Sequence, residues 1–230
     1  MGLCNSTIGD SERVNRWRLT GIVALRDCKL KIFPNQVLEL EASVRTLDLT
    51  NNKIDDVPKE IDKLINIQRL ILADNHIERL PVNLGKLESL KMLTLDGNRL
   101  TSLPDELGFL RKLEQLSVSR NLLTSLPETI GRLRYLKLLN ISHNKLESLP
   151  DSIGGCFSLE ELQANDNSIK HLPLSICNLN CLKSLCMDNN NVSQMEGFQD
   201  FEERRKKKFD KLIDSNVMIS SKGLDEGIDL

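Results

Sequence analysis

Apolar and polar positions along the chain repeat with a period of 23 residues. Each block reads LxxLxLxxNxL, and seven blocks begin at Val44, Ile67, Leu90, Leu113, Leu136, Leu159 and Leu182. A fixed period of this length is the signature of a solenoid, in which each turn contacts only its neighbours. Such an array offers a long exposed surface and no enclosed cleft, so the pattern favours binding over catalysis.

Each block begins with the alternation of a short strand. In the block at Leu90, Leu93 and Leu95 alternate with polar residues, which is strand periodicity. We expect these strands to pair in parallel and to point Leu90, Leu93, Leu95 and Leu100 inward. No turn can bury its own leucines alone, so stability comes from stacking.

An asparagine marks the end of each strand segment. An asparagine amide both donates and accepts hydrogen bonds, so a column of asparagines can satisfy backbone groups of adjacent turns. The predicted ladder comprises Asn52, Asn75, Asn98, Asn121, Asn144, Asn167 and Asn190.

The second half of each block reads LPxxIGxLxxL. All seven prolines lie here or at the matching place in the first turn, where proline fixes φ at the start of a short helical segment. Leu107 and Leu110 illustrate the helical spacing that faces the core. Gly85, Gly108, Gly131 and Gly154 recur four residues after a proline, where we expect a tight turn on the convex side.

A degenerate turn precedes the seven regular ones. Val23, Leu25 and Leu30 keep the apolar positions, Cys28 replaces the asparagine and Thr20 replaces the first leucine. We therefore predict four segments. They are 1–19, an acylation segment and cap; 20–195, an eight-turn repeat domain; 196–215, a capping helix; and 216–230, a disordered tail.

With these residues in place, the consensus resembles the intracellular leucine-rich-repeat proteins of the Ras-suppressor and plant Ras-group-related type, including a small N-myristoylated member. The resemblance covers most of the chain. It implies an α/β solenoid, or horseshoe, with parallel strands on the concave face and short helical or 3-10 segments on the convex face. It also implies that the partner is a protein such as a small GTPase, a kinase or a phosphatase subunit.

Composition removes several classes of partner. The net charge is -2, from 31 basic and 33 acidic residues, and aromatic residues make up 3%. The balanced charge gives no overall positive potential to attract nucleic acid. The low aromatic content gives no surface on which bases could stack. No apolar run approaches the length of a transmembrane helix. The six cysteines form no paired caps, which favours a reducing, cytoplasmic location. We expect a monomer without a cofactor.

The concave face is the candidate partner-binding surface. Its side chains alternate with the buried leucines, and eight strands about 4.8 Å apart give a surface roughly 35 Å long. Met92 and Leu138 are candidate apolar anchors; the alternative is an ordinary solvated strand face. The candidate residues are Asp48, Arg69, Ile71, Met92, Thr94, Asp96, Gln115, Ser117, Leu138, Asn140, Glu161 and Gln163.

A second candidate surface follows the asparagines. The residues are Lys29, Lys53, His76, Arg99 and Lys145, which we call the basic row. An acidic partner would suit this row, and the alternative is solvated surface.

The amino terminus fits the pattern M-G-x-x-x-[ST], with Gly2 as the acceptor of myristate and Ser6 at the favoured position. Cys4 is placed to receive palmitate, and two acyl chains hold a protein on a membrane where one does so only marginally. We therefore predict a peripheral protein on the cytosolic face of a membrane. The alternative is an unmodified end, with Trp17 covering the first turn.

Beyond the repeats, apolar residues fall on one stripe of a predicted helix over 198–213. The run Arg204–Lys208 resembles a nuclear-import or lipid-binding patch. The alternative is the solvated face of a capping helix.

An enzyme is the rival class. His171, Cys177, Cys181 and Cys186 have a spacing that zinc ligands can show, but the repeat places Cys177 and Cys181 on the convex segment and Cys186 on a concave strand. We therefore expect no metal site and no catalysis, and predict a non-enzymatic adaptor or scaffold in intracellular signalling. The first alternative is a regulatory subunit that docks onto an enzyme. The second, which the pattern favours less, is a metal- or thiol-dependent enzyme.

Overall fold

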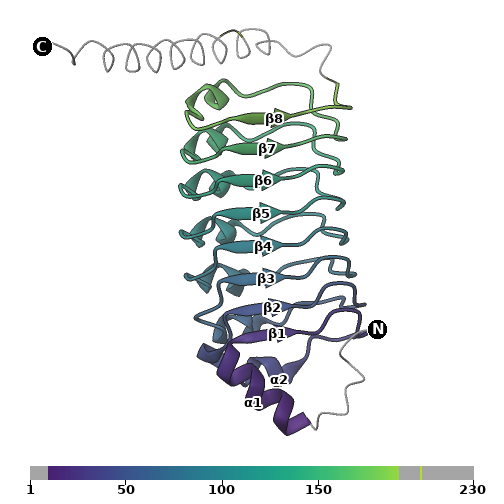
Figure 1. Cartoon of the computed structure of the whole chain (residues 1–230). Coiled ribbons are helices and arrows are strands. Elements are labelled where there is room, and N and C mark those ends of the chain that lie inside the picture. Colours follow the sequence, from purple (N-terminus) through teal and green to yellow (C-terminus); the bar gives the residue numbers. More distant parts are fainter. Residues whose placement is uncertain (1–9, 192–202, 204–230) are drawn as a thin grey trace, which may run out of the picture. The chain divides into compact units, whose positions relative to one another are not determined.

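The computed structural model describes residues 10–191 and residue 203 of the 230-residue chain. The chain divides into two compact units, Met1–Gln194 and Met195–Leu230. The first unit contains the repeats (Figure 1). Within the second, only Glu203 is described; it is helical and exposed. The capping helix predicted over 196–215, the run Arg204–Lys208 and the tail 216–230 otherwise lie outside the described residues.

Eight three-residue strands form one parallel sheet in sequential order, one strand per turn. The register joins Ile22 to Thr46, and then Thr46 to Arg69, so the single inserted residue of the first turn is absorbed outside the strands. The strands are β1 (Ile22–Ala24), β2 (Thr46–Asp48), β3 (Arg69–Ile71), β4 (Met92–Thr94), β5 (Gln115–Ser117), β6 (Leu138–Asn140), β7 (Glu161–Gln163) and β8 (Ser184–Cys186).

The middle residue of each regular strand points into the core. Leu93, Leu116 and Leu139 are completely buried, and they stack at matching register positions of β4, β5 and β6. The core is thus a stack of leucine layers rather than a single cluster. This arrangement confirms the predicted parallel solenoid.

Short 3-10 helices run along the side opposite the sheet. A proline immediately precedes each of the six regular ones; Pro104, for example, has φ of -69° and ψ of 147°. The proline thereby fixes the extended residue from which the helix starts. These helices are η3 (Lys59–Lys63), η4 (Val82–Lys86), η5 (Asp105–Phe109), η6 (Glu128–Arg132), η7 (Asp151–Gly155) and η8 (Leu174–Asn178).

Glycine permits adjacent 3-10 helices to approach closely. A Cβ added to Gly108 in η5 would lie 2.5 Å from the carbonyl oxygen of Thr129 in η6. That distance is well inside van der Waals contact, so the glycine sets the spacing of neighbouring turns on the convex side.

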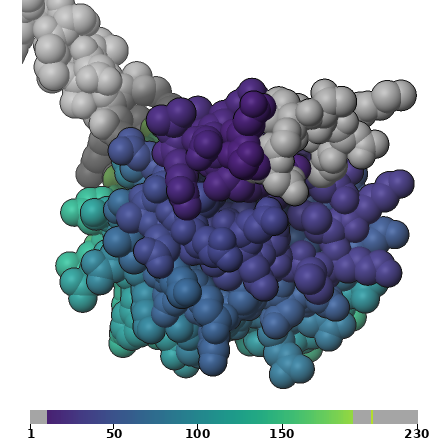
Figure 2. Space-filling view, turned by 90° about the horizontal axis from the view of Figure 1, so that it is seen from below, coloured from purple at the N-terminus to yellow at the C-terminus, as the bar shows by residue number. Residues whose placement is uncertain are grey.

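A short helix packs at the amino-terminal end of the array. Helix α1 (Asp10–Thr20) precedes β1. Two further short helices, α2 (Asn35–Leu38) and η2 (Glu41–Ser43), lie between β1 and β2 in the chain. Figure 2 shows this end, with α1 in purple. Trp17 is 6% exposed. Thr20, at the position of the first leucine in a regular turn, is exposed at the end of α1. Trp17 rather than Thr20 therefore supplies buried apolar surface at this end.

Candidate functional site

The register places the candidate partner-binding residues in two parallel columns. All but one occupy the first and third positions of β2–β7, on either side of the buried leucines. The exception is Asp96, which lies two residues beyond the end of β4. Ile71, Met92 and Leu138 are partly exposed although they are apolar. The sheet face therefore carries apolar side chains that the core does not cover.

Two of these residues contact each other across neighbouring strands. Arg69 Nη2 lies 3.7 Å from Met92 Sδ. The contact covers part of Met92 with a cationic side chain, so β3 and β4 present an apolar surface with a charged border.

The first candidate, Asp48, is engaged within the protein. Its side chain is 4% exposed and forms an ion pair with Arg26 of the preceding turn. It also accepts hydrogen bonds from the Thr50 hydroxyl, at 2.7 Å, and backbone N–H, at 3.1 Å. Burial raises the pKa of Asp48, but the hydrogen bonds from Arg26 and Thr50 outweigh it and hold the pKa below its usual value. Asp48 is thus a structural member of the face.

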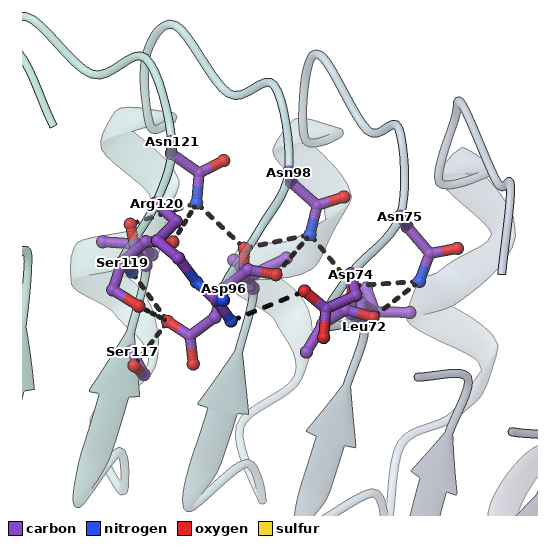
Figure 3. Close-up of polar contacts among 12 residues, drawn as sticks. Leu72, Asp74, Asn75, Asp96, Asn98, Ser117, Ser119, Arg120 and Asn121 are labelled. Atoms are coloured by element: carbon purple, nitrogen blue, oxygen red, sulfur yellow. Dashed lines mark hydrogen bonds and ion pairs between the residues drawn. The ribbon is translucent and has the colours of Figure 1, made fainter. Parts of the chain in front are cut away.

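Asp96 is likewise held by its neighbours (Figure 3). Its Oδ1 accepts hydrogen bonds from the Ser117 hydroxyl at 2.6 Å, the Ser119 hydroxyl at 2.8 Å and the Ser119 backbone N–H at 2.7 Å. These bonds fix the orientation of Asp96 between β4 and β5. The surface that remains for a partner consists mainly of Ile71, Met92, Thr94, Leu138 and Asn140, which are all partly exposed.

Three further candidates are polar residues of β5 and β7. Gln115 and Glu161 are exposed first residues of β5 and β7, and Gln163 is the partly exposed third residue of β7. Gln115 lies in register between Met92 and Leu138, whereas Glu161 and Gln163 extend the face towards β8.

Asparagines join each turn to the one before it. Asn98 Nδ2 donates to Leu95 O in its own turn and to Leu72 O in the preceding turn, both at 2.9 Å. Its Oδ1 accepts a hydrogen bond from the Ile77 N–H at 3.0 Å. Figure 3 shows the donor bonds of three successive members. The same bonds recur at the other ladder positions: Asn52, Asn75, Asn121, Asn144, Asn167 and Asn190.

The residue before each ladder asparagine has a left-handed backbone, which the sequence analysis missed. Most are Asp, Asn or Gly, the residue types that tolerate positive φ, and this composition was the available signal. Arg120 and His143 adopt the same conformation with φ of 53° and 55°. The column consists of Asn51, Asp74, Gly97, Arg120, His143, Asp166 and Asn189, and Asp27 before Cys28 takes the same conformation in the first turn.

The basic row borders an open depression of about 450 Å³. Lys53, His76 and Arg99 line it together with ladder asparagines and Gly97, and Asp74 is the acidic residue in the lining. Backbone hydrogen bonds fix the row: the N–H of His76 donates to Ile54 O, and the N–H of Arg99 donates to Ile77 O, both at 2.9 Å. The depression thus lies where the chain leaves the sheet.

A different column, just before the strands, carries alternating charges. Lys137 Nζ lies 2.8 Å from Glu114 Oε2, and Lys183 lies 2.5 Å from Glu160 Oε2. The hydrogen bonds from these lysines lower the pKa of both glutamates. From Lys91 to Lys183, the charges that precede the strands are therefore paired with one another.

The cysteines of the rival enzyme hypothesis are dispersed. Cys156 is completely buried, Cys177 and Cys186 are half-buried, and Cys181 is exposed. Within residues 10–191 and residue 203, no three side chains of the His, Cys, Asp and Glu types converge as metal ligands would. Burial raises the pKa of the Cys156 thiol to about 12, so at neutral pH it is a protonated core residue.

The predicted acylation residues, Gly2 and Cys4, lie outside the described residues. Helices in the described part of the chain are all too short or too polar to cross a bilayer.

Comparison with known sequences identifies repeats of one family. A model described as a leucine-rich repeat region matches residues 4–125 and 83–165. Plant intracellular Ras-group-related LRR protein 7 of Oryza sativa is 58% identical over 72 residues, which are 30% of this chain and 28% of that protein. Protein 8 of the same rice series is 45% identical over 58 residues, or 25% of this chain and 15% of that protein. The matched segments therefore span less than a third of these relatives.

Comparison with solved structures gives the same fold. A leucine-rich-repeat protein of Leptospira interrogans superposes with a TM-score of 0.58 and 30% identity, covering 79% of this chain and 58% of that one. The ectodomain of the Arabidopsis thaliana receptor kinase GASSHO1/SCHENGEN3 was solved in complex with CASPARIAN STRIP INTEGRITY FACTOR 2. It superposes with a TM-score of 0.64 and 32% sequence identity, and the match covers 69% of this chain and 20% of that one.

Proposed function

The chain belongs to the leucine-rich-repeat proteins, and on this premise we propose that it is a non-enzymatic adaptor that holds a protein partner on the concave face of its sheet. Proteins of this architecture are interaction modules whose long concave surfaces bind their partners. The relatives named Ras-group-related are also named intracellular, and this supports an adaptor in intracellular signalling.

One observation carries the proposal: the exposed face of β3–β6 presents apolar side chains at its centre. Ile71, Met92 and Leu138 are partly exposed and lie beside small polar residues that a partner can approach closely. Interfaces draw most of their affinity from such central apolar contacts, surrounded by a polar rim. One of the similar structures is plant peptide hormone receptor RGFR1 in complex with RGF2, which supports a protein or peptide partner.

The test compares two double variants of the full chain by quantitative affinity capture. Met92→Glu with Leu138→Glu adds two charges to the concave face. Phe109→Glu with Tyr135→Glu adds the same charges outside the sheet, at Phe109 of η5 and at Tyr135 between η6 and β6. These two residues are 47% and 63% exposed. We expect the concave variant alone to lose its partners. Equal capture by the concave variant and the wild type would exclude the concave face.

The proposal includes attachment to the cytosolic face of a membrane through acyl groups on Gly2 and Cys4. A myristoyl chain alone gives marginal binding, with an association constant of about 10⁴ M⁻¹, and a second chain makes the attachment stable. Gly2→Ala should therefore release the protein from membrane fractions and abolish myristate incorporation. Cys4→Ser should keep myristate and weaken retention. Retention of Gly2→Ala on membranes would refute the tether while leaving the concave-face proposal intact.

A regulatory subunit that docks onto a GTPase, kinase or phosphatase is the second candidate. A regulatory subunit would use the same concave face as an adaptor, and only the nature of its partner would differ. If captured proteins include such an enzyme, its activity with the wild type and with the concave variant separates a regulator from a passive scaffold.

A further inference from the structure

Cations of the basic row lack the ion pairs that several other cations near the sheet form. Arg26, Lys137 and Lys183 each form an ion pair with a carboxylate. In contrast, Lys29, Lys53, His76, Arg99 and Lys145 form no ion pair with any residue in the described ranges 10–191 and 203. The row is therefore a line of cations that no described carboxylate pairs with, on a protein whose total charge is nearly balanced.

The first four members occupy four consecutive turns. Backbone bonds from Lys53 N–H to Leu30 O, at 2.7 Å, and from His76 N–H to Ile54 O, at 2.9 Å, hold successive members one strand apart. Three strand spacings amount to about 14 Å. The cations thus lie along a line and do not converge on one point, which is the arrangement expected for a linear polyanion rather than for a single phosphate.

The depression beside the row gives such a ligand space. Lys53, His76 and Arg99 line it, and Gly97 contributes no side chain. Its acidic member, Asp74, forms an ion pair with Arg120, whose Nη2 lies 3.5 Å from Asp74 Oδ1. The negative charge inside the depression is therefore offset by a cation that is not part of the row.

From these observations we propose that the basic row binds an extended, carboxylate-rich segment of a protein partner along the edge where the chain leaves the sheet. Four or five extended residues at about 3.4 Å each span the four cations. Acidic side chains of the segment pair with Lys29, Lys53 and Arg99, and the depression receives the segment near His76. This site is separate from the concave face, so one partner can contact both surfaces or two partners can bind together.

The test measures binding of a fluorescein-labelled decaglutamate peptide to the full chain by fluorescence anisotropy at low ionic strength, with decaglutamine as the uncharged reference. The variant Lys53→Gln with Arg99→Gln removes two charges from the row. The matched control, Lys112→Gln with Arg134→Gln, removes two equally exposed cations from segments that precede the strands. All four residues are exposed, so the fold should be kept, and circular dichroism checks it.

We expect the row variant to bind decaglutamate about tenfold more weakly, the sum of two exposed ion pairs, and the control to bind as the wild type does. Added salt should weaken wild-type binding. Equal loss in both variants, or unchanged binding in the row variant, would overturn the proposal. Phosphatidylserine vesicles form a further arm: if the row variant loses vesicle binding but not decaglutamate binding, the surface recognises lipid headgroups and the peptide proposal is wrong.

Discussion

Arg120 Nη2 lies 3.5 Å from Asp74 Oδ1, although the two residues belong to turns separated by a complete repeat (Figure 3). The turn between them has Gly97 at the corresponding position. A side chain there would meet the Asp74 carboxylate, because an added Cβ at Gly97 would overlap Asp74 Oδ1. The glycine thus opens the path by which Arg120 reaches Asp74.

A substitution at Gly97 should depend on backbone tolerance more than on size. Its φ of 65° is left-handed, which asparagine tolerates and valine does not. Asn51 Nδ2 also donates to Asp27 Oδ1 one turn earlier, so Gly97→Asn can form the same bond to Asp74. We expect Gly97→Val to lower the free energy of unfolding by about 2 kcal/mol and Gly97→Asn by less than about 1 kcal/mol. Urea unfolding measures both, and equal losses would contradict the backbone explanation.

Loss of a ladder amide should be costlier in the middle of the array than at its end. Asn98→Ala leaves the buried Ile77 N–H without its acceptor and removes one of the two amide donors to the Leu72 carbonyl, which keeps its bond from Asn75. We expect a loss of about 1–3 kcal/mol, the cost of leaving a buried N–H unsatisfied. Asn190 makes the same kinds of bond but is only partly buried. Asn190→Ala should therefore cost less, and an equal cost would mean that burial does not control the ladder.

The Asp48–Arg26 pair should make stability pH-dependent in acid. The pKa of Asp48 is lowered in the folded state, so folding stabilises the carboxylate form. This contribution is fully present above the unfolded pKa, about 3.9, and is lost as the pH falls through the folded pKa. Asp48→Asn should cost about 1–2 kcal/mol at pH 7.

That deficit relative to the wild type should shrink as the pH is lowered below about 4. Denaturant unfolding of both proteins over this range provides the measurement. A deficit that stays constant in acid would show that the charge of Asp48 contributes nothing, and that the loss comes from packing alone.

Cys156 and Cys181 should react with thiol reagents at different rates. Cys156 is buried and its pKa is raised to about 12, so its thiolate is scarce and inaccessible. Cys181 is exposed. Under native conditions at pH 8, iodoacetamide should modify Cys181 first, and Cys156 only after denaturant is added. Mass spectrometry of the peptides resolves the two sites, and rapid native labelling of Cys156 would contradict its place in the core.

The period of 23 residues was sufficient to predict the parallel sheet and its register. Strand β4 pairs with β5 at the positions that the leucines indicated, with Leu93 opposite Leu116. This succeeded because in a solenoid the contacts of each residue are set by its equivalents one period away. The first turn was harder, because its end is covered by α1 and Trp17 rather than by another repeat.

The site was less predictable, because the position of a residue in a column does not reveal whether its side chain already bonds to other residues of the protein. Sequence analysis placed Asp48 on the concave face, and its register is as expected. Its burial depends on Arg26 and Thr50, which lie 22 residues earlier and two residues later. The left-handed column was also missed, because Arg120 and His143 hide the pattern that Asp, Asn and Gly would otherwise reveal.

By itself the sequence determined which residues face the core, which asparagines end the strands and which side chains share a column, because these follow from a period that every turn repeats. Only the tertiary structure decided which of the surface charges are compensated. Asp74 meets Arg120 across Gly97, whereas Lys53 and Arg99 meet no described carboxylate. Ion pairing depends on side-chain reach between turns, and distances of a few ångströms are not contained in a repeat pattern.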